Sequence, residues 1–108
     1  MVPTKKNISD FRNIITIVDQ IAKKNDIKFY FVYISSRQKY SSKLDGETYP
    51  EIVKIIANLN VPFIDLHKSF IEYYDPLSFF PFRRQLHYNE KGYKFVSEKI
   101  YQFIKLNE

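Results

Sequence analysis

Apolar residues recur at helical spacing in the first quarter of the chain. Between Ser9 and Asn25 they stand three or four positions apart, as on the buried face of an amphipathic helix. Ser9 is a residue type favoured at helix N-caps, and Lys23 and Lys24 complement the negative end of the helix dipole. The pattern predicts a helix that ends near Asn25 and has these inward-facing positions: Phe11, Ile14, Ile15, Val18, Ile21 and Ala22.

Two shorter segments have the character of strands. Residues 28–34 (KFYFVYI) are almost continuously apolar or aromatic, which is typical of a parallel strand covered on both faces. Residues 61–66 (VPFIDL) have the same character, and Pro62 stands near their start, where a missing N–H group is tolerated. We predict a buried strand in each segment.

Helical patterns surround the second strand. Thr48 and Glu51 have the spacing of a capping box with Pro50 in the first turn, which predicts a helix. Residues 67–74 fit a short helix, and residues 75–88 form an aromatic loop. Two sets of inward-facing residues are expected, Ile52, Val53, Ile55, Ile56 and Leu59 in the second helix, and Tyr93, Val96, Ile100, Phe103 and Ile104 in a last helix capped by Asn89.

This order of elements predicts an α/β fold. A strand, a crossover helix and a second strand lie parallel in such folds, with helices packed against the sheet. Two parallel strands alone leave long edges without hydrogen-bond partners. We therefore expect residues 1–108 to be a single or partial domain whose sheet is completed by an N-terminal half or by a second chain.

Composition narrows the classes of function. The chain has 108 residues, of which 44% are hydrophobic and 18% aromatic, so a folded domain is expected rather than a disordered segment. The net charge of +5 raises the question of nucleic-acid binding. The lysines are scattered over polar positions of the helical segments, however, and most aromatic residues stand at core positions. A nucleic-acid partner is therefore disfavoured.

Several kinds of chemistry are disfavoured because the sequence lacks the residues that they need. With no cysteine there is no disulfide, thiolate nucleophile or zinc-finger ligand set. His67 and His87 stand about 20 residues apart without a close carboxylate set, so we expect neither a metal site nor a cofactor. No apolar run approaches the roughly 20 residues that span a bilayer, and the N-terminus lacks a signal-peptide core. We expect a soluble chain, and the sequence leaves its compartment open.

His87 is the strongest candidate for chemistry. It stands two residues before Asn89, at a predicted junction between a loop and a helix. Histidine takes and returns protons near neutral pH, so a rigidly held imidazole there is a candidate general base. An isolated histidine near a helix start is also a common surface residue. Nearby, Gly92 either permits tight packing beneath this loop or is simply tolerated in the first helical turn.

The segments FVYIS, VPFIDL and FFPFRRQLHYNEKGYKFVSEKI together resemble the C-terminal portion of the SGNH/GDSL hydrolases. The resemblance covers nearly the whole chain in element order, and its specific part is HYNEKGY with its flanks. It implies a partial flavodoxin-like parallel sheet with flanking helices, and an esterase or acyl hydrolase that often acts on acetylated carbohydrate. It also implies that His87 is the base that activates a serine.

The chain departs from this family in two respects. The Gly-Asp-Ser block that carries the nucleophile, and the blocks that build the oxyanion hole, do not occur in the 108 residues, so we expect no activity from the chain alone. The family usually has an aspartate three residues before the histidine, where this chain has Arg84. Asp65 and Asp75 are candidates for the missing acid, and each can equally be a structural cap.

A ligand is expected at the carboxyl ends of the strands, where open α/β sheets bind their ligands. The loops there contain the candidate substrate-binding residues Arg37, Tyr40, Arg84 and Tyr88. Such groups suit a sugar or an anionic acyl substrate, and they equally suit a solvated loop. Besides the hydrolase, two alternatives remain: a small basic α/β module that binds a protein or nucleic acid, and a structural remnant without activity.

Overall fold

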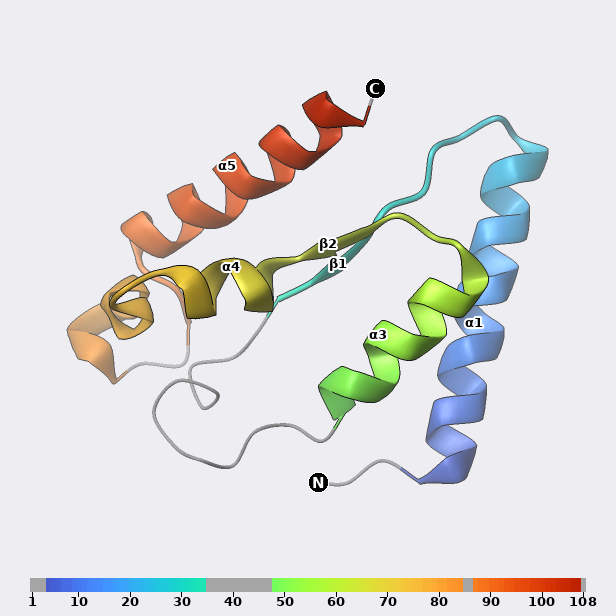
Figure 1. Cartoon of the computed structure of the whole chain (residues 1–108), viewed down its shortest axis with the longest axis horizontal. Helices are drawn as coiled ribbons and strands as arrows, with labels where there is room; N and C mark the ends of the chain where they lie inside the picture. Colours follow the sequence, from blue (N-terminus) through green and yellow to red (C-terminus); the bar gives the residue numbers. More distant parts are fainter. Residues whose placement is uncertain (1–3, 35–47, 85–86, 108) are drawn as a thin grey trace. The chain divides into compact units, whose positions relative to one another are not determined.

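The protein is mixed α/β, with a small two-stranded parallel sheet and a larger helical part. The computed structural model describes residues 4–34, 48–84 and 87–107. In chain order the elements in Figure 1 are α1 Lys5–Lys24, β1 Phe31–Tyr33, α3 Thr48–Leu59, β2 Phe63–Asp65, α4 Leu66–Glu72, the 3-10 helices η1 Pro76–Phe79 and η2 Pro81–Arg83, and α5 Glu90–Leu106.

The sheet pairs β1 directly with β2. The backbone N–H of Phe31 donates to the carbonyl oxygen of Pro62 over 2.8 Å, immediately before the second strand begins. Proline has no N–H group to donate, but its carbonyl oxygen can accept, and that is the group used here. The predicted α/β class and both strands are confirmed. Each strand has three residues and is therefore shorter than its predicted segment.

The chain divides into two compact units, and each strand passes from one into the other. The first unit contains the described residues of 1–31 and 46–63, which include α1 and α3. The second contains the described residues of 32–45 and 64–108, which include α4, both 3-10 helices and α5. Each unit has its own buried cluster.

Helix α1 begins earlier than predicted. Its N-cap is Thr4, whose side-chain oxygen accepts a hydrogen bond from the Asn7 N–H at 3.1 Å. The prediction of Ser9 as N-cap is therefore wrong: the apolar pattern starts near Ser9, but the preceding polar residues continue the helix. Asn25 is the C-cap, and Asp26 follows with a φ of 56°, the left-handed conformation that often ends helices.

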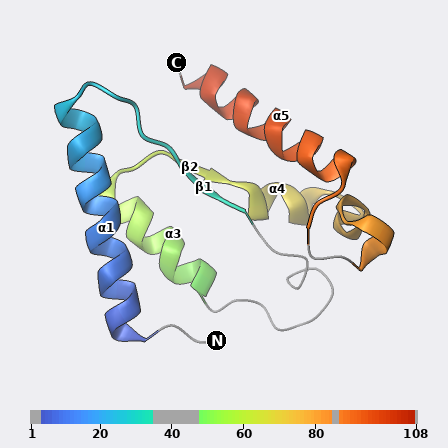
Figure 2. The ribbon, with the colours of Figure 1, turned by 180° about the vertical axis from the view of Figure 1, so that it is seen from behind.

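The core of the first unit lies between α1, α3 and the adjoining strand residues, and both ribbon views show the two helices side by side (Figures 1 and 2). Ile15, Ile56 and Val61 are buried there, and the rings of Phe31 and Phe63 stack against each other at 5.8 Å. α1 contributes less than predicted, because Ile14 and Ile21 are exposed. The described elements cover only one flank of its broad apolar face.

The second unit is built around aromatic side chains. Phe70 of α4, with Phe79 and Phe80, is fully buried, and α5 contributes Phe95 to the same cluster. The ring centroid of Phe95 lies 5.2 Å from that of Phe70 and 4.6 Å from that of Phe79. Each of these pairs adds to stability beyond the area that it buries.

Two predictions about this unit need correction. Residues 75–88 were expected to form a loop, but they contain η1 and η2, each of which begins with a proline whose fixed φ favours a helical turn. Tyr93 was expected to face inward, but 58% of its surface is exposed. Phe95 occupies the inward position instead, because the first turn of α5 is held against η1 and this contact sets the rotation of the helix.

We predict that Phe70→Ala lowers the free energy of unfolding by about 3–5 kcal/mol, because it removes the central ring of a close-packed cluster. Phe82→Ala is the matched control, since 89% of the Phe82 surface is exposed, and it should change the stability by less than about 0.5 kcal/mol. Urea unfolding followed by circular dichroism measures both. Equal effects of the two substitutions would show that the aromatic cluster does not stabilise the fold.

Candidate functional site

His87 is exposed and stands between η2 and α5, two residues before Asn89. The prediction that Asn89 caps the following helix is confirmed, because its Oδ1 accepts a hydrogen bond from the Gly92 N–H at 2.8 Å. The imidazole Nδ1 of His87 lies 3.1 Å from the carbonyl oxygen of Tyr88. The candidate base therefore stands at the entrance of a capped helix, as its position in the sequence suggested.

The contact with Tyr88 selects the tautomer of His87. A carbonyl oxygen can only accept a hydrogen bond, so Nδ1 must carry the proton that is shared in this contact. In the neutral ring the lone pair is then on Nε2. This is the arrangement that a general base needs, and in Ser-His-Asp triads a carboxylate fixes it. For His87 the acceptor at Nδ1 is a backbone carbonyl.

The two candidate acids have other partners. Asp65 is the N-cap of α4, and its Oδ1 accepts a hydrogen bond from the Lys68 N–H at 3.1 Å. Asp75 forms an ion pair with Arg83, in which Oδ2 and Nη1 are 2.7 Å apart. Both carboxylates therefore have structural roles in the described chain, and the observed partner of the His87 ring is the carbonyl of Tyr88.

The pair of Asp75 and Arg83 holds an unusual turn. Phe82 and Arg83 have φ angles of 51° and 61°, in the left-handed region that side chains other than glycine seldom adopt. The Arg83 guanidinium donates to Asp75 and lowers the pKa of that carboxyl, while the same bond raises the pKa of Arg83. Because both groups stay charged near neutral pH, their attraction persists there and helps to maintain the turn.

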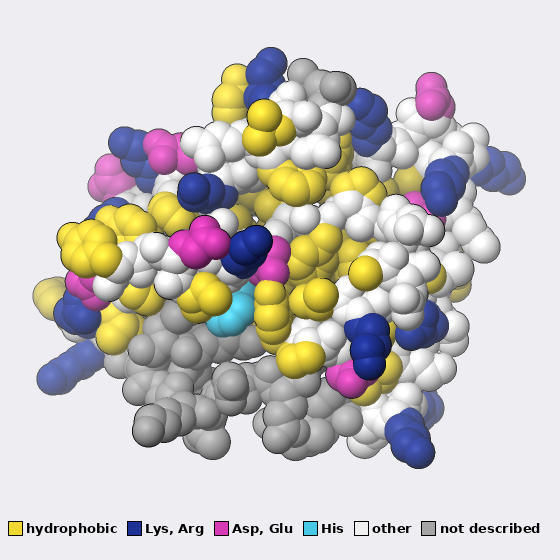
Figure 3. Space-filling model, in the orientation of Figure 1, with side chains coloured by type: hydrophobic (Ala, Val, Ile, Leu, Met, Phe, Trp, Pro, Cys, Tyr) yellow, Lys and Arg dark blue, Asp and Glu magenta, His cyan; other side chains and the backbone are white. Residues whose placement is uncertain are grey.

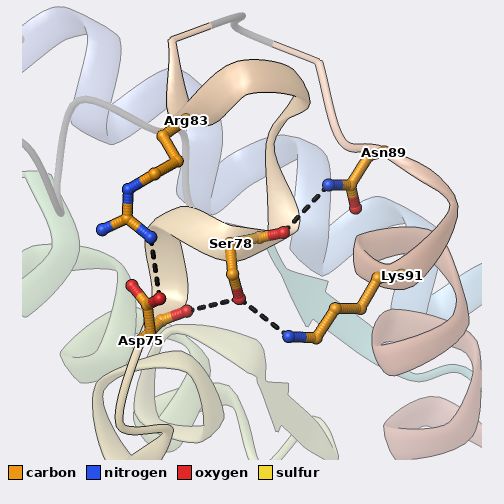
Figure 4. Close-up of polar contacts among 5 residues, drawn as sticks. All are labelled: Asp75, Ser78, Arg83, Asn89 and Lys91. Carbon is orange, nitrogen blue, oxygen red and sulfur yellow. Dashed lines mark hydrogen bonds and ion pairs between the residues drawn. The ribbon is translucent and has the colours of Figure 1, made fainter.

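A polar cluster missed by the sequence analysis joins this turn to α5 (Figure 4). The Ser78 hydroxyl donates to the carbonyl oxygen of Asp75 at 2.7 Å and accepts from Nζ of Lys91 at 2.9 Å. Nδ2 of Asn89 donates to the carbonyl oxygen of Ser78 at 2.9 Å. Asn89 and Lys91 are 11 and 13 residues from Ser78, and no local pattern links them to it, so only the N-cap role of Asn89 could be predicted.

Ser78 and Lys91 have the separation of a Ser–Lys catalytic pair, but their charge state argues against that chemistry. A lysine activates a serine when it is neutral and can accept the hydroxyl proton. A hydrogen bond to Tyr73 raises the pKa of Lys91, and the ammonium also lies 5.1 Å from the Tyr73 ring centroid. Lys91 therefore remains protonated near neutral pH. Because the Ser78 hydroxyl already donates to Asp75, we assign the pair a structural role.

Gly92 permits the close approach of α5 to η1. A Cβ atom at this position would lie 2.5 Å from the carbonyl oxygen of Phe79 and 3.0 Å from the Cβ of Tyr88. No side chain fits in that space without moving backbone. Of the two roles considered for Gly92, tight packing beneath the segment that carries His87 is confirmed.

The structure describes two of the four candidate binding residues, Arg84 and Tyr88. Arg37 and Tyr40 lie outside the described residues. Arg84 is exposed at the end of η2, where its N–H donates to the carbonyl of Pro81. Tyr88 belongs to the core, since its ring stacks on Phe80 at 4.8 Å, and burial raises the pKa of its phenol. The group of Tyr88 that contacts His87 is its carbonyl oxygen.

A shallow hollow of about 260 Å³ opens on the same unit. Aromatic rings and charged groups line it, and these are Tyr73, Phe79, Lys91, Lys94, Phe95 and Glu98. Its volume is below the range of ordinary small-molecule pockets. His87 is not among its lining residues, so the hollow and the candidate base are distinct features of the surface.

Within residues 4–34, 48–84 and 87–107, no three His, Asp or Glu side chains come together in a way that would hold a metal ion. In the same part of the chain no helix has the length and apolar character needed to cross a membrane. On the face shown in Figure 3 the Lys and Arg side chains are spread apart rather than gathered into one patch. Three lysines are paired with acidic residues on their own helices, namely Lys6, Lys23 and Lys94.

Comparison of the chain with protein-family models, with curated proteins and with solved structures finds no match in any of the three.

We predict that Asn89→Ala destabilises the protein by about 2 kcal/mol, because it removes both the helix cap and the donor to Ser78. Asn89→Ser keeps a capping oxygen and loses only that donor, so its cost should be about 1 kcal/mol. Asn107→Ala, at the exposed end of α5, is the control and should have little effect. Thermal and urea unfolding measure all three, and equal stabilities of the Asn89 variants and the wild type would contradict the assignment.

Proposed function

We propose that this chain is the C-terminal part of an SGNH/GDSL-like ester hydrolase, in which His87 is the general base. The observation that carries the proposal is the contact between His87 Nδ1 and the carbonyl of Tyr88. It leaves Nε2 as the proton acceptor in the neutral ring, and the side chain is exposed where a second group can approach it. The substrate class suggested by the sequence resemblance is an acyl or acetyl ester, including esters of carbohydrate.

The proposal requires a second component. A base contributes only part of the acceleration of ester hydrolysis, and the larger part comes from a positioned nucleophile and an oxyanion hole. An N-terminal half or a second chain would supply both. Its site of assembly would be a free edge of the β1–β2 sheet, because within the described residues each strand has one strand neighbour.

In the proposed reaction the serine of the second component attacks the ester carbonyl and gives its proton to Nε2 of His87. The Nδ1–H bond to the Tyr88 carbonyl holds the ring in the required tautomer throughout this transfer. The resulting imidazolium then protonates the departing alcohol, and water hydrolyses the acyl-enzyme by the same route in reverse. The carbonyl stabilises the imidazolium less than a carboxylate would, since it carries no full charge.

The tautomer is directly measurable. We predict that neutral His87 carries its proton on Nδ1, so that ¹⁵N chemical shifts of the ring give a protonated Nδ1 and an unprotonated Nε2. Nuclear magnetic resonance of the chain labelled at histidine nitrogen, with His87→Gln to assign the signals, makes the measurement. A neutral ring protonated on Nε2 would remove the main support for the proposal, because that nitrogen would then have no lone pair to accept the serine proton.

The catalytic role is testable by complementation. The isolated chain should not hydrolyse an activated acetyl ester above background, and a fluorophosphonate probe should label no serine, Ser78 included. Co-expression with an SGNH N-terminal portion that carries the Gly-Asp-Ser block should give an active complex. His87→Ala in that complex should lower kcat by about a thousandfold, because the serine then has no base.

Three controls separate catalysis from folding. His67→Gln should retain most of the activity, and copurification of the two parts reports assembly for each variant. Asp65→Asn and Asp75→Asn distinguish the carbonyl from a carboxylate as the group that orients the ring. A large loss of kcat in either Asn variant, with assembly intact, would assign the orienting role to that acid. Full activity without His87 would refute the catalytic assignment.

A further inference from the structure

Helix α1 presents a second apolar face to solvent. Ile14, Ile17, Val18 and Ile21 are exposed over 59%, 54%, 40% and 56% of their surfaces. Their spacing of three, four and seven residues from Ile14 places them in one row on the helix. Single exposed apolar residues are common, but a contiguous row of four marks an interaction surface.

The charges at the two ends of this row are opposite. Asp10 precedes Ile17 by seven residues and Lys24 follows it by seven, and both are exposed. Seven residues are almost two full helical turns, so Asp10, Ile17 and Lys24 lie nearly in line along α1. Asp10 and Lys24 are therefore about 21 Å apart, with the apolar row between them.

We propose that this face binds a second copy of the chain, with the two α1 helices antiparallel and crossing near Ile17. A surface that meets its own copy across a two-fold axis must be self-complementary. When Ile17 faces its counterpart, Asp10 of one copy faces Lys24 of the other, and the same contact occurs twice. The parallel arrangement would instead place Asp10 against Asp10 and Lys24 against Lys24, so the charges specify the antiparallel one.

Other charges on the helix are compatible with this arrangement. Lys6 donates to Asp10 at 2.8 Å and Lys23 pairs with Asp19 at 2.9 Å within the same helix. In the dimer the Asp10 carboxylate would lie between Lys6 of its own chain and Lys24 of the partner. The net charge of +5 on each copy opposes association, but salt at physiological strength screens that repulsion beyond roughly 8 Å.

The dimer should be weak. A 20-residue helix is about 30 Å long, and a contact along one such helix buries less area than standard stable interfaces do. This association uses a helix face and does not depend on the catalytic role of His87. It also differs from pairing at the sheet edge, which involves backbone hydrogen bonds and would not respond to charges on α1.

Sedimentation velocity of the full chain over about a hundredfold range of concentration tests the proposal, with wild type, Asp10→Lys and Lys24→Asp compared. Each variant alone places like charges opposite each other, so its dimer should dissociate about tenfold more readily than that of wild type. An equimolar mixture of the two restores both opposite-charge contacts and should regain dimer. Lys54→Asp, an exposed charge change on α3, should dimerise like wild type.

Circular dichroism of each variant checks that its helices are retained. Only variants that pass this check are used in the mixing experiment. A wild-type chain that stays monomeric throughout would overturn the proposal. Self-association that the charge changes leave unaltered, or that the mixture fails to restore, would also overturn it and would assign the contact to another surface such as the sheet edge.

Discussion

The small size of the sheet is the constraint from which most of the structure follows. Within the described residues the sheet is the pair β1 and β2, each three residues long. A helix buries its apolar face only against what is available to cover it, and here α3 and a few strand residues cover one flank of α1. The exposed row on α1 and the lack of a further strand neighbour for β1 and β2 among the described residues are two consequences of the same shortage of covering structure.

The second unit buries its apolar surface mainly with aromatic side chains. Phenylalanine and tyrosine rings supply much apolar area for each residue, so short elements such as α4 and η1 can form a cluster without a sheet. The polar contacts of Asn89 and the absence of a side chain at Gly92 then hold α5 directly on η1. The position of His87 follows, because the residue stands just before that fixed helix start.

The ring of His87 has a backbone carbonyl as the acceptor at Nδ1. An imidazole that acts as a base needs a defined tautomer and orientation, and any acceptor at Nδ1 supplies the tautomer. Where the resembled family usually has an aspartate, this chain has Arg84, and Asp65 and Asp75 have other partners. The carbonyl of Tyr88 is held in place because the Tyr88 ring is packed between core aromatics. The geometry of the candidate base therefore depends on core packing.

The sequence by itself predicted the order of the described α-helices and strands, though not the two 3-10 helices, since periodicity and caps such as Asn89 are local properties that neighbouring residues encode. It also indicated His87 as the candidate base. Tertiary structure decided which face of each element is buried: Ile14 and Tyr93 are exposed and Phe95 packs against the aromatic cluster because packing partners, not periodicity, set the rotation of a helix. Tertiary structure also brought about the hydrogen bond between Lys91 and Ser78 and the ion pair between Asp75 and Arg83. Contacts between residues that are distant along the chain have no local signal, so only the folded chain reveals them.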